Sequence, residues 1–280
     1  MRRIILFCTA LLLSMPSAWS QAKRIVTLSA ALSETVHALG KGSRIVAVDV
    51  TSEYPLEIKQ KPRVSKDRTV SLESLLSFKP DLVLTPPAEL TPETQRKLKQ
   101  LGVRVVTITQ EYSVKGAQRF IQDVGTAVGA KEEGLRLATK VGKESNQALQ
   151  EIANRAQKPK VLFIYAQGVG LMSVAGKGSQ LDAIISLAGG RNAVQEFSDF
   201  KPYSTEALIK ANPDALLLFD FGVSSLGGRN AVLRMPGIGL TKAGKQKNII
   251  AMDGPLLVNF STRLPLAIRE LNKKLYALPQ

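Results

Sequence analysis

Two acidic residues recur at matching positions in a phrase that the chain contains twice. Residues 70–84 read VSLESLLSFKPDLVL and residues 203–217 read YSTEALIKANPDALL, so that Glu73 corresponds to Glu206 at an offset of 133 residues. A Ser stands two positions before each Glu and can cap a helix, because its hydroxyl accepts a hydrogen bond from an N–H two or three residues on. Each carboxylate then opposes the positive end of the helix dipole and stabilises the helix by about 0.3–1 kcal/mol. On local physics alone, both glutamates are helix-start acids, and the repeat indicates one helix–strand unit used twice.

The chain lacks the residue groupings that most catalytic and metal sites need. His37 is the only histidine, and it lies inside the helical pattern SETVHALG, which favours a buried or half-buried helix residue over a ligand. Without a His cluster, a Cys pair or an H-E-x-x-H motif, a zinc site held by the protein is not expected. The glycine-rich stretch GVGLMSVAGKG lacks the order of a nucleotide-binding loop. No nucleophile–base pair stands out as a motif, so we expect a protein that is not an enzyme.

Residues 1–20 have the composition of a secretory signal peptide. Two arginines precede an apolar run over residues 4–13, and small residues follow up to Ser20. We expect cleavage after Ser20, since the run is too short for a permanent membrane helix. Cleavage would remove the only cysteine, Cys8, so that a hydrophobic core and not disulfides must stabilise the secreted chain.

The chain carries a large surplus of positive charge. It has 38 Lys and Arg against 23 Asp and Glu, a net charge of +15 that falls to +13 without Arg2 and Arg3. Such a surplus favours an anionic partner, which could be a small anion, a nucleic acid or a membrane surface. The secreted location and the lack of a dense basic run with interleaved aromatic residues argue against nucleic acid.

Short β-branched runs alternate with helical patterns on both sides of a long strand-free stretch. We predict strands at 24–28, 45–49, 81–85, 103–108, 160–166, 215–219 and 248–253. Residues 131–158 keep apolar side chains broadly on one side and predict one helix of about 25 residues, roughly 38 Å long. The expected fold is α/β, with two Rossmann-like lobes joined by a single long helix. The lobes would occupy 21–113 and 159–280, with a connecting helical segment over 114–158.

This arrangement resembles the substrate-binding proteins of bacterial ABC importers for iron complexes and cobalamin. The first lobe carries S-x-E-x-L-L-x-x-x-P-D-L-V-L, and the second carries LAGGRNAVQEFSDFKPYSTEALIKANPDALLLFD, LGGRNAVLRMPGIGLT and FSTRLPLAIRELNKKLY. The second group is similar to the periplasmic haem-binding proteins in particular, and the similarity covers residues 23–278. The resemblance implies a periplasmic carrier that captures haem (hemin) as its transported ligand, has no catalytic cofactor, and delivers the haem to an ABC permease.

The resemblance gives the repeated glutamates a second role. In that family, one glutamate on each lobe docks into the membrane-embedded permease dimer, and the matching positions here are Glu73 and Glu206. One anionic contact per lobe would fix the orientation of a monomeric carrier. The ligand is expected in the cleft between the lobes, where loops leave the carboxyl ends of the strands.

The loop before the first copy of the phrase departs from the family pattern. Family members read V-G-Y-x-R-x-L-S there and bind haem iron through the Tyr, whereas this chain reads VSKDRTVS, with Lys66 in place of the Tyr and Arg68 kept. A lysine must lose its proton before it can ligate a metal, so Lys66 is better suited to meet a carboxylate. Lys66 and Arg68 would form an anion-binding pair for the two haem propionates. A solvated basic loop is the alternative.

Another residue must ligate the iron if the protein ligates it at all. Tyr165, at the end of the predicted strand KVLFIYA, is the preferred substitute because Tyr is an established haem ligand, although a strand aromatic can equally belong to the core. Gln167, from the same strand end, and Tyr203, beside the second docking segment, are further ligand-binding candidates. Three more candidates near the cleft are Tyr54, Tyr112 and Met172.

Other functions compete with haem delivery at this point. A carrier for a ferric siderophore or a corrinoid is the runner-up, favoured by the missing Tyr. A periplasmic ligand-buffering or sensor protein that never docks to a permease is a second option. An enzyme or chaperone built on the same plan is a third.

Overall fold

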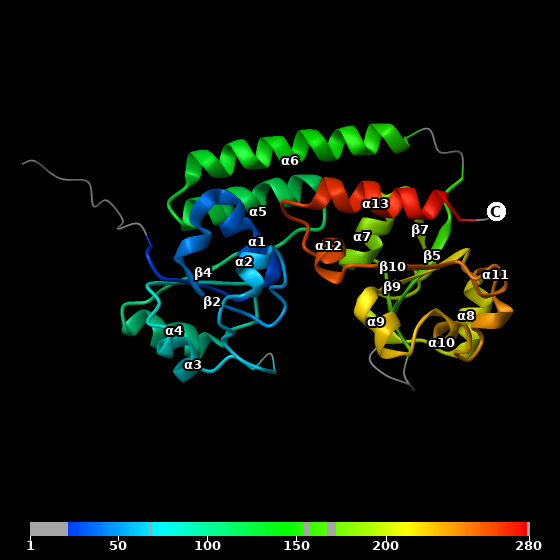
Figure 1. Cartoon of the computed structure of the whole chain (residues 1–280), viewed down its shortest axis with the longest axis horizontal. Coiled ribbons are helices and arrows are strands. Elements are labelled where there is room, and N and C mark those ends of the chain that lie inside the picture. Colours follow the sequence, from blue (N-terminus) through cyan, green and yellow to red (C-terminus); the bar gives the residue numbers. More distant parts are fainter. Residues whose placement is uncertain (1–21, 68, 154–156, 167–171, 279–280) are drawn as a thin grey trace, which may run out of the picture.

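Two α/β lobes lie side by side and are bridged along one side by helices (Figure 1). The structure is a computed structural model, and it describes residues 22–67, 69–153, 157–166 and 172–278. The predicted signal peptide, Arg68 and Gln167 lie outside the described residues.

The N-terminal lobe is built on a parallel sheet with the strand order β2-β1-β3-β4. Its elements are β1 (Ile25–Thr27), α1 (Ala30–Val36), η1 (His37–Lys41), η2 (Gly42–Arg44), β2 (Ile45–Val48), α2 (Leu56–Lys59), α3 (Leu72–Ser77), β3 (Leu82–Thr85), α4 (Pro92–Gln100) and β4 (Arg104–Thr107). The central strands β1 and β3 are fully buried, as expected for a parallel sheet covered on both faces.

The C-terminal lobe has the strand order β10-β9-β5-β6-β8, with β7 also paired to β5. Its elements are β5 (Lys160–Tyr165), β6 (Ser173–Ala175), α7 (Gln180–Leu187), β7 (Arg191–Asn192), β8 (Phe200–Pro202), α8 (Thr205–Ala211), β9 (Ala215–Phe219), α9 (Asp220–Ser225), α10 (Arg229–Leu233), η3 (Ile238–Leu240), α11 (Lys242–Lys245), β10 (Ile249–Met252), α12 (Gly254–Val258) and α13 (Leu264–Tyr276). Strands β5, β7, β9 and β10 are parallel, whereas β6 and β8 add an antiparallel extension.

All of the predicted strands are confirmed, and their bounds differ by at most one residue at each end. The prediction missed β6, β7 and β8, which are two or three residues long. Strands this short leave no room for the alternating or continuous apolar pattern on which a sequence-based assignment depends.

The bridge between the lobes contains two helices where the sequence predicted one. The long helix α6 (Lys131–Ile152) has 22 residues and runs along both lobes (Figure 1), and α5 (Val114–Ala127) packs against it. On α5, Ala117 belongs to the core of the C-terminal lobe, whereas Phe120 belongs to that of the N-terminal lobe. The bridge is therefore part of both cores.

A glycine inside α6 lets the two bridging helices approach closely. A Cβ atom on Gly134 would lie 3.1 Å from the Cα atom of Gly125 on α5, and a Cβ atom on Gly125 would lie 2.9 Å from the Cα atom of Gly134. Glycine costs about 1 kcal/mol of helix propensity in a helix interior. Here that cost is offset by the close contact between α5 and α6.

The repeated phrase forms the same helix–strand unit in each lobe. Ser71 caps α3 by accepting a hydrogen bond from Ser74 N at 3.0 Å, and Ser204 caps α8 by accepting from Ala207 N at 3.1 Å. Both predicted caps are confirmed. The Asp of the Pro-Asp pair also plays the same part in both lobes. It accepts a hydrogen bond from a backbone N–H that lies just before, or at the start of, the first strand of its lobe. The bonds are Lys23 N to Asp81 at 2.7 Å and Lys160 N to Asp214 at 2.8 Å.

Candidate functional site

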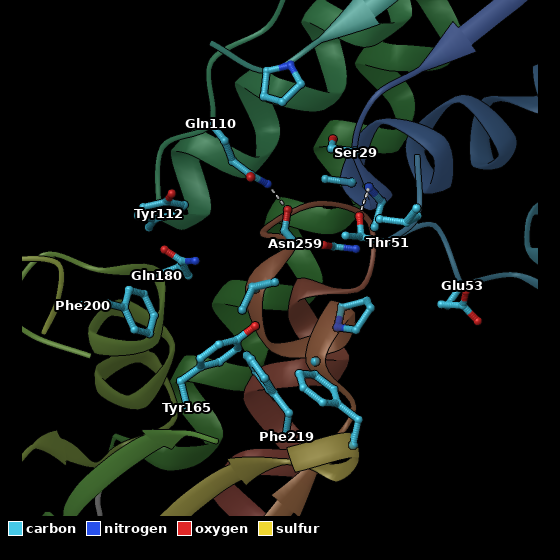
Figure 2. Close-up of a pocket in the computed structure, with 18 of the residues that line it drawn as sticks. Ser29, Thr51, Glu53, Gln110, Tyr112, Tyr165, Gln180, Phe200, Phe219 and Asn259 are labelled. Carbon is cyan, nitrogen blue, oxygen red and sulfur yellow. Dashed lines mark hydrogen bonds between the residues drawn. The ribbon is translucent and has the colours of Figure 1, made fainter. Parts of the chain in front are cut away.

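A cavity of about 860 Å³ lies between the lobes, at the carboxyl ends of strands from both sheets (Figure 2). Ser29, Pro86 and Gln110 line it shortly after β1, β3 and β4 end. Tyr165 and Phe219, the last residues of β5 and β9, line it from the other lobe. This is the place at which open α/β sheets bind ligands, and the volume lies in the range of small-molecule sites.

Aromatic rings form the wall that the C-terminal lobe contributes. The Tyr165 ring stands edge-on to three others that also line the cavity, at centroid distances of 6.4, 6.1 and 6.3 Å to Phe200, Phe219 and Phe221. Phe219 also packs against the buried Phe163 at 4.8 Å, which anchors the cluster in the core. Edge-to-face packing fixes ring orientations, so the cavity has a rigid π-rich wall.

The opposite wall includes the hydroxyl groups of Ser29 and Thr51. Thr51 Oγ1 accepts a hydrogen bond from Ala30 N at 3.3 Å and also bonds to Asp49. Asp49 is 9 % exposed, and its other oxygen accepts from Ser52 Oγ at 2.5 Å. The buried carboxylate therefore orients the Thr51 side chain at the start of α1.

The two walls differ in polarity, and Figure 2 shows them on opposite sides of the cavity: Tyr165, Phe200 and Phe219 on one, Ser29, Thr51 and Glu53 on the other. Among the described residues that line the cavity, none is Lys or Arg. Glu53 is the acid of the lining, and Lys59 Nζ and Arg63 Nη2 pair with it at 2.9 and 2.8 Å. Positive charge therefore stands just outside the cavity, beside Glu53.

A second phenol enters the cavity from the chain between β4 and α5. The ring of Tyr112 packs on Phe260 with centroids 5.3 Å apart. Burial and the nearby Asp199 carboxylate raise the pKa of the Tyr112 hydroxyl. Tyr112 therefore stays protonated at neutral pH and is a hydrogen-bond donor rather than a phenolate.

Of the ligand-binding residues that the sequence suggested, the structure brings Tyr165 and Tyr112 into the cavity. Lys66 is exposed and does not line it. Figure 1 shows the connection between α2 and α3, which includes Lys66, on the side of its lobe that faces the C-terminal lobe. Tyr54 lies outside the lining and stacks on Arg263, with 4.0 Å between guanidinium carbon and ring centroid.

Tyr203 has a local role outside the cavity lining. Its hydroxyl donates to Glu196 Oε1 at 2.9 Å, and its ring packs on Phe197 at 6.3 Å. Burial and the Glu196 carboxylate raise the pKa of Tyr203, which disfavours the phenolate that would ligate iron. Met172 lies partly buried against the core of its lobe, outside the lining. His37 is half-buried in η1, as its sequence context predicts.

Glu73 and Glu206 are exposed in the first turns of α3 and α8. Backbone and side-chain contacts connect each helix with strands of its own lobe. Within α3, Ser74 Oγ donates to the carbonyl of Val64, whose N–H bonds to Val48 at the carboxyl end of β2. Glu206 follows β8, in which Pro202 pairs with the cavity-lining Ser173. A hydrogen bond from its own backbone N–H and one from the Ser204 hydroxyl lower the pKa of Glu206, so it is charged at neutral pH.

Several residues of the cavity were not anticipated from the sequence. They are Ser29, Thr51, Gln110, Gln180, Phe200, Phe219, Phe221 and Asn259. Most of them lie at or within a few residues after the end of a predicted strand. Their position just after the strand ends could have identified them as cavity residues, because α/β sheets bind ligands at the carboxyl ends of their strands.

Comparison with known proteins identifies the class. Residues 25–256 match the model of the periplasmic binding protein family, and the chain belongs to that family. It is a family of periplasmic or lipoprotein substrate-binding proteins and not a class of enzymes. Within the described residues, no helix combines the length and apolarity needed to span a bilayer.

Solved structures of haem-binding members are similar over nearly their whole length. The periplasmic haem-binding protein BhuT, in complex with two haems, is 36% identical with a TM-score of 0.87, over 91% of this chain and 98% of that chain. The periplasmic haem-binding protein RhuT from Roseiflexus sp. RS-1, in apo form, is 35% identical with a TM-score of 0.87 and the same two coverages.

Other relatives are not described as haem-binding proteins. An uncharacterised ABC transporter substrate-binding lipoprotein, YvrC of Bacillus subtilis, is 28% identical over 91% of this chain and 81% of its own length. A vitamin B12-binding protein of Vibrio cholerae is 26% identical over 79% of this chain and 78% of its own length. The chain is thus similar to binding proteins for more than one metallated macrocycle.

Proposed function

We propose that this protein captures haem in the cavity between its lobes and delivers it to the permease of an ABC importer. The observation that carries the proposal is the aromatic wall around Tyr165. A rigid wall of edge-packed rings suits the apolar face of a flat macrocycle, and burial of that face provides the driving force. The similarity to BhuT and RhuT supports the same ligand class.

Tyr165 is the proposed axial ligand of the iron. It ends β5 within the aromatic wall and lines the cavity. A phenolate oxygen ligates ferric haem in other proteins. Tyr112, whose pKa is raised by burial, is less suited to ligate iron and better suited to donate a hydrogen bond to the ligand.

The haem propionates would point out of the cavity, because its described lining carries an acid and no base. In this arrangement Lys66, with Arg68, would meet them from the connection between α2 and α3. Gln167 would approach the ligand from the end of β5. The surplus of positive charge on the chain would also attract an anionic ligand.

Docking of the loaded carrier is proposed to use Glu73 and Glu206. Both are exposed and belong to different lobes, so together they would form a two-point contact. Two charges on separate lobes can fix the orientation of the carrier on a permease dimer. The distance between them also changes with the spacing of the lobes, so the permease contact would depend on that spacing. The carrier would act as a monomer in the periplasm after removal of residues 1–20.

The deciding experiment is a titration of the protein, without residues 1–20, with ferric haem, followed by absorption spectroscopy. We expect saturable binding and a phenolate-to-iron charge-transfer band that Tyr165→Phe abolishes. Tyr203→Phe is the matched control, because Tyr203 lies outside the cavity, and it should leave the band unchanged. Absence of saturable haem binding by the parent protein would refute the proposal.

A corrinoid carrier is the second candidate function. The family resemblance implies a ligating Tyr at the position of Lys66, and the chain is similar to a vitamin B12-binding protein over most of its length. Cobalamin carries neutral amides in place of free propionates and gains less from a basic loop. A parallel titration with cobalamin separates the two, since the candidate functions predict opposite orders of affinity.

A further inference from the structure

A buried carboxylate of the N-terminal lobe is held by donors of the C-terminal lobe. Glu34, on α1, is 2% exposed. Arg263 donates to it through Nε at 2.9 Å and through Nη2 at 2.6 Å, and Asn259 donates through Nδ2 at 2.7 Å. In the part of the chain that the structure describes, every hydrogen bond to this carboxylate crosses between the lobes.

The arginine of this group is clamped by a second part of the N-terminal lobe. The ring of Tyr54, in the connection between β2 and α2, stacks on the guanidinium at 4.0 Å. Asp253, in the arginine's own lobe, lies 3.7 Å from Nη1. The Arg263 side chain is 16% exposed, so water reaches it only in part. A fork-shaped cation held by a carboxylate and a ring has one favourable position.

Separation of the lobes would strip Glu34 of its donors. A carboxylate that is buried without a partner is far more costly than one that is paired, because desolvation is no longer compensated. The lobes can part here only if Glu34 becomes hydrated or takes up a proton. The favourable pairing of Glu34 is therefore available only while the two lobes stay at this spacing.

This polar group lies directly behind the cavity. Ala30, four residues and about one helical turn before Glu34, lines the cavity from α1. Asn259 lines it from the end of α12 and is 8% exposed. Gln110, another lining residue, donates a hydrogen bond to the backbone carbonyl of Asn259. The spacing between these walls is thus coupled to the pairing of Glu34.

We infer that Glu34 and Arg263 form an interlobe tie that sets the width of the cavity, and that this width selects a flat macrocycle over a bulkier one. Asn259 transmits the tie to the ligand, because its amide nitrogen is fixed by Glu34 while the residue lines the cavity. Both members of the pair are positioning residues. The selectivity part rests on the proposed haem function, whereas the effect on lobe spacing does not.

Lobe spacing can be measured without any ligand, since residues 21–280 contain no cysteine. Glu57→Cys on α2 and Ser224→Cys on α9 place spin labels at exposed sites on the two lobes. The parent protein should give one narrow distance distribution. With Glu34→Gln, we expect a broader distribution with a longer mean. Glu151→Gln is the matched control, because it breaks an exposed Glu–Arg pair between α6 and α13 and should leave the distribution unchanged.

Selectivity is then measured as the ratio of haem to cobalamin affinity. We expect Glu34→Gln to lower that ratio about tenfold, within the range usual for coupling between linked sites. Tyr54→Leu, which changes a half-exposed residue and leaves the buried pair intact, should shift both measurements in the same direction by less. It also keeps the test decisive if Glu34→Gln does not fold. An unchanged distance distribution in a folded Glu34→Gln protein overturns the tie, even if haem binding fails. A shifted distribution with an unchanged affinity ratio overturns the selectivity.

Discussion

The ring of Tyr165 stands edge-on to the ring of Phe219, with centroids 6.1 Å apart and ring planes at 84°. The two residues end neighbouring parallel strands, β5 and β9, so the sheet itself brings their side chains together. An edge-to-face neighbour restricts the rotation of the phenol ring. Tyr165 is therefore a preorganised part of the cavity wall.

The aromatic wall should contribute directly to ligand affinity. Phe221 is 50% exposed and packs on Tyr165 and Phe219, so Phe221→Ala removes wall surface without opening the core. We expect haem affinity to fall about three- to tenfold, since one aromatic contact contributes roughly 0.5–1.5 kcal/mol. Titration of both proteins with haem measures the change. Leu240→Ala, at an exposed apolar residue outside the cavity lining, should have no effect.

The repeated glutamates should be needed for import and not for ligand binding. Reversal of both charges in Glu73→Arg with Glu206→Arg should abolish haem uptake in cells, because each arginine would meet a permease surface suited to an acid. The purified double variant should bind haem as the parent does. Glu93→Arg changes another exposed acid in the first turn of a helix, α4, and should leave uptake intact. Normal uptake by the double variant would show that docking does not use these residues.

The two helix caps of the repeat should stabilise the protein to a similar degree. Ser71→Ala and Ser204→Ala each remove a hydroxyl that accepts a first-turn N–H, and such changes cost about 0.5–2 kcal/mol. Chemical denaturation measures the loss in free energy of unfolding. Ser77→Ala serves as the control, because its hydroxyl donates to a carbonyl within α3 and caps no N–H. A loss in only one of the cap variants would contradict the equivalence of the two units.

Asp214 should make the free energy of unfolding depend on pH under acidic conditions. Burial acts to raise its pKa, but the Lys160 N–H and the Lys242 ammonium, 2.8 and 2.9 Å away, outweigh burial and hold the pKa below its usual value. A depressed native pKa stabilises the fold above the unfolded pKa of about 3.9, and this stability is lost as the pH falls through the native value. Asp214→Asn should therefore lower the thermal midpoint at neutral pH, and the difference from the parent should shrink below about pH 3.9. Asp220→Asn, at an exposed aspartate, is the matched control.

Sequence patterns predicted the sheets well, because their strands are continuous apolar runs such as Ala215–Phe219 bounded by turn residues. The capping role of Ser71 and Ser204 was also predictable from the sequence, since capping is a local interaction between neighbours in sequence. The division of the bridge into α5 and α6 was not anticipated. Both helices bury small residues against each other, as Gly125 and Gly134 illustrate, and such contacts leave little apolar periodicity.

The site was only partly predictable from the sequence. The position of Tyr165 in the cavity wall was predictable because the residue ends a predicted strand, and strand ends converge on the ligand site in this fold class. Asn259 and Gln110 were not, since their contact joins residues 149 positions apart through the docking of two lobes. The pairing of Glu34 with Arg263 was equally unpredictable from the sequence, because Arg263 lies 229 positions away. Long-range pairing depends on the relative placement of the lobes, which no local pattern encodes.

The opposite characters of the two cavity walls imply an order of events when a planar guest departs. Water that enters a parting cleft can hydrate Ser29, Thr51 and Glu53 immediately, whereas the aromatic wall is not stabilised by contact with water. The guest would thus peel away from the first lobe and remain longest on the second. A transporter that draws the lobes apart would receive its cargo from the C-terminal half.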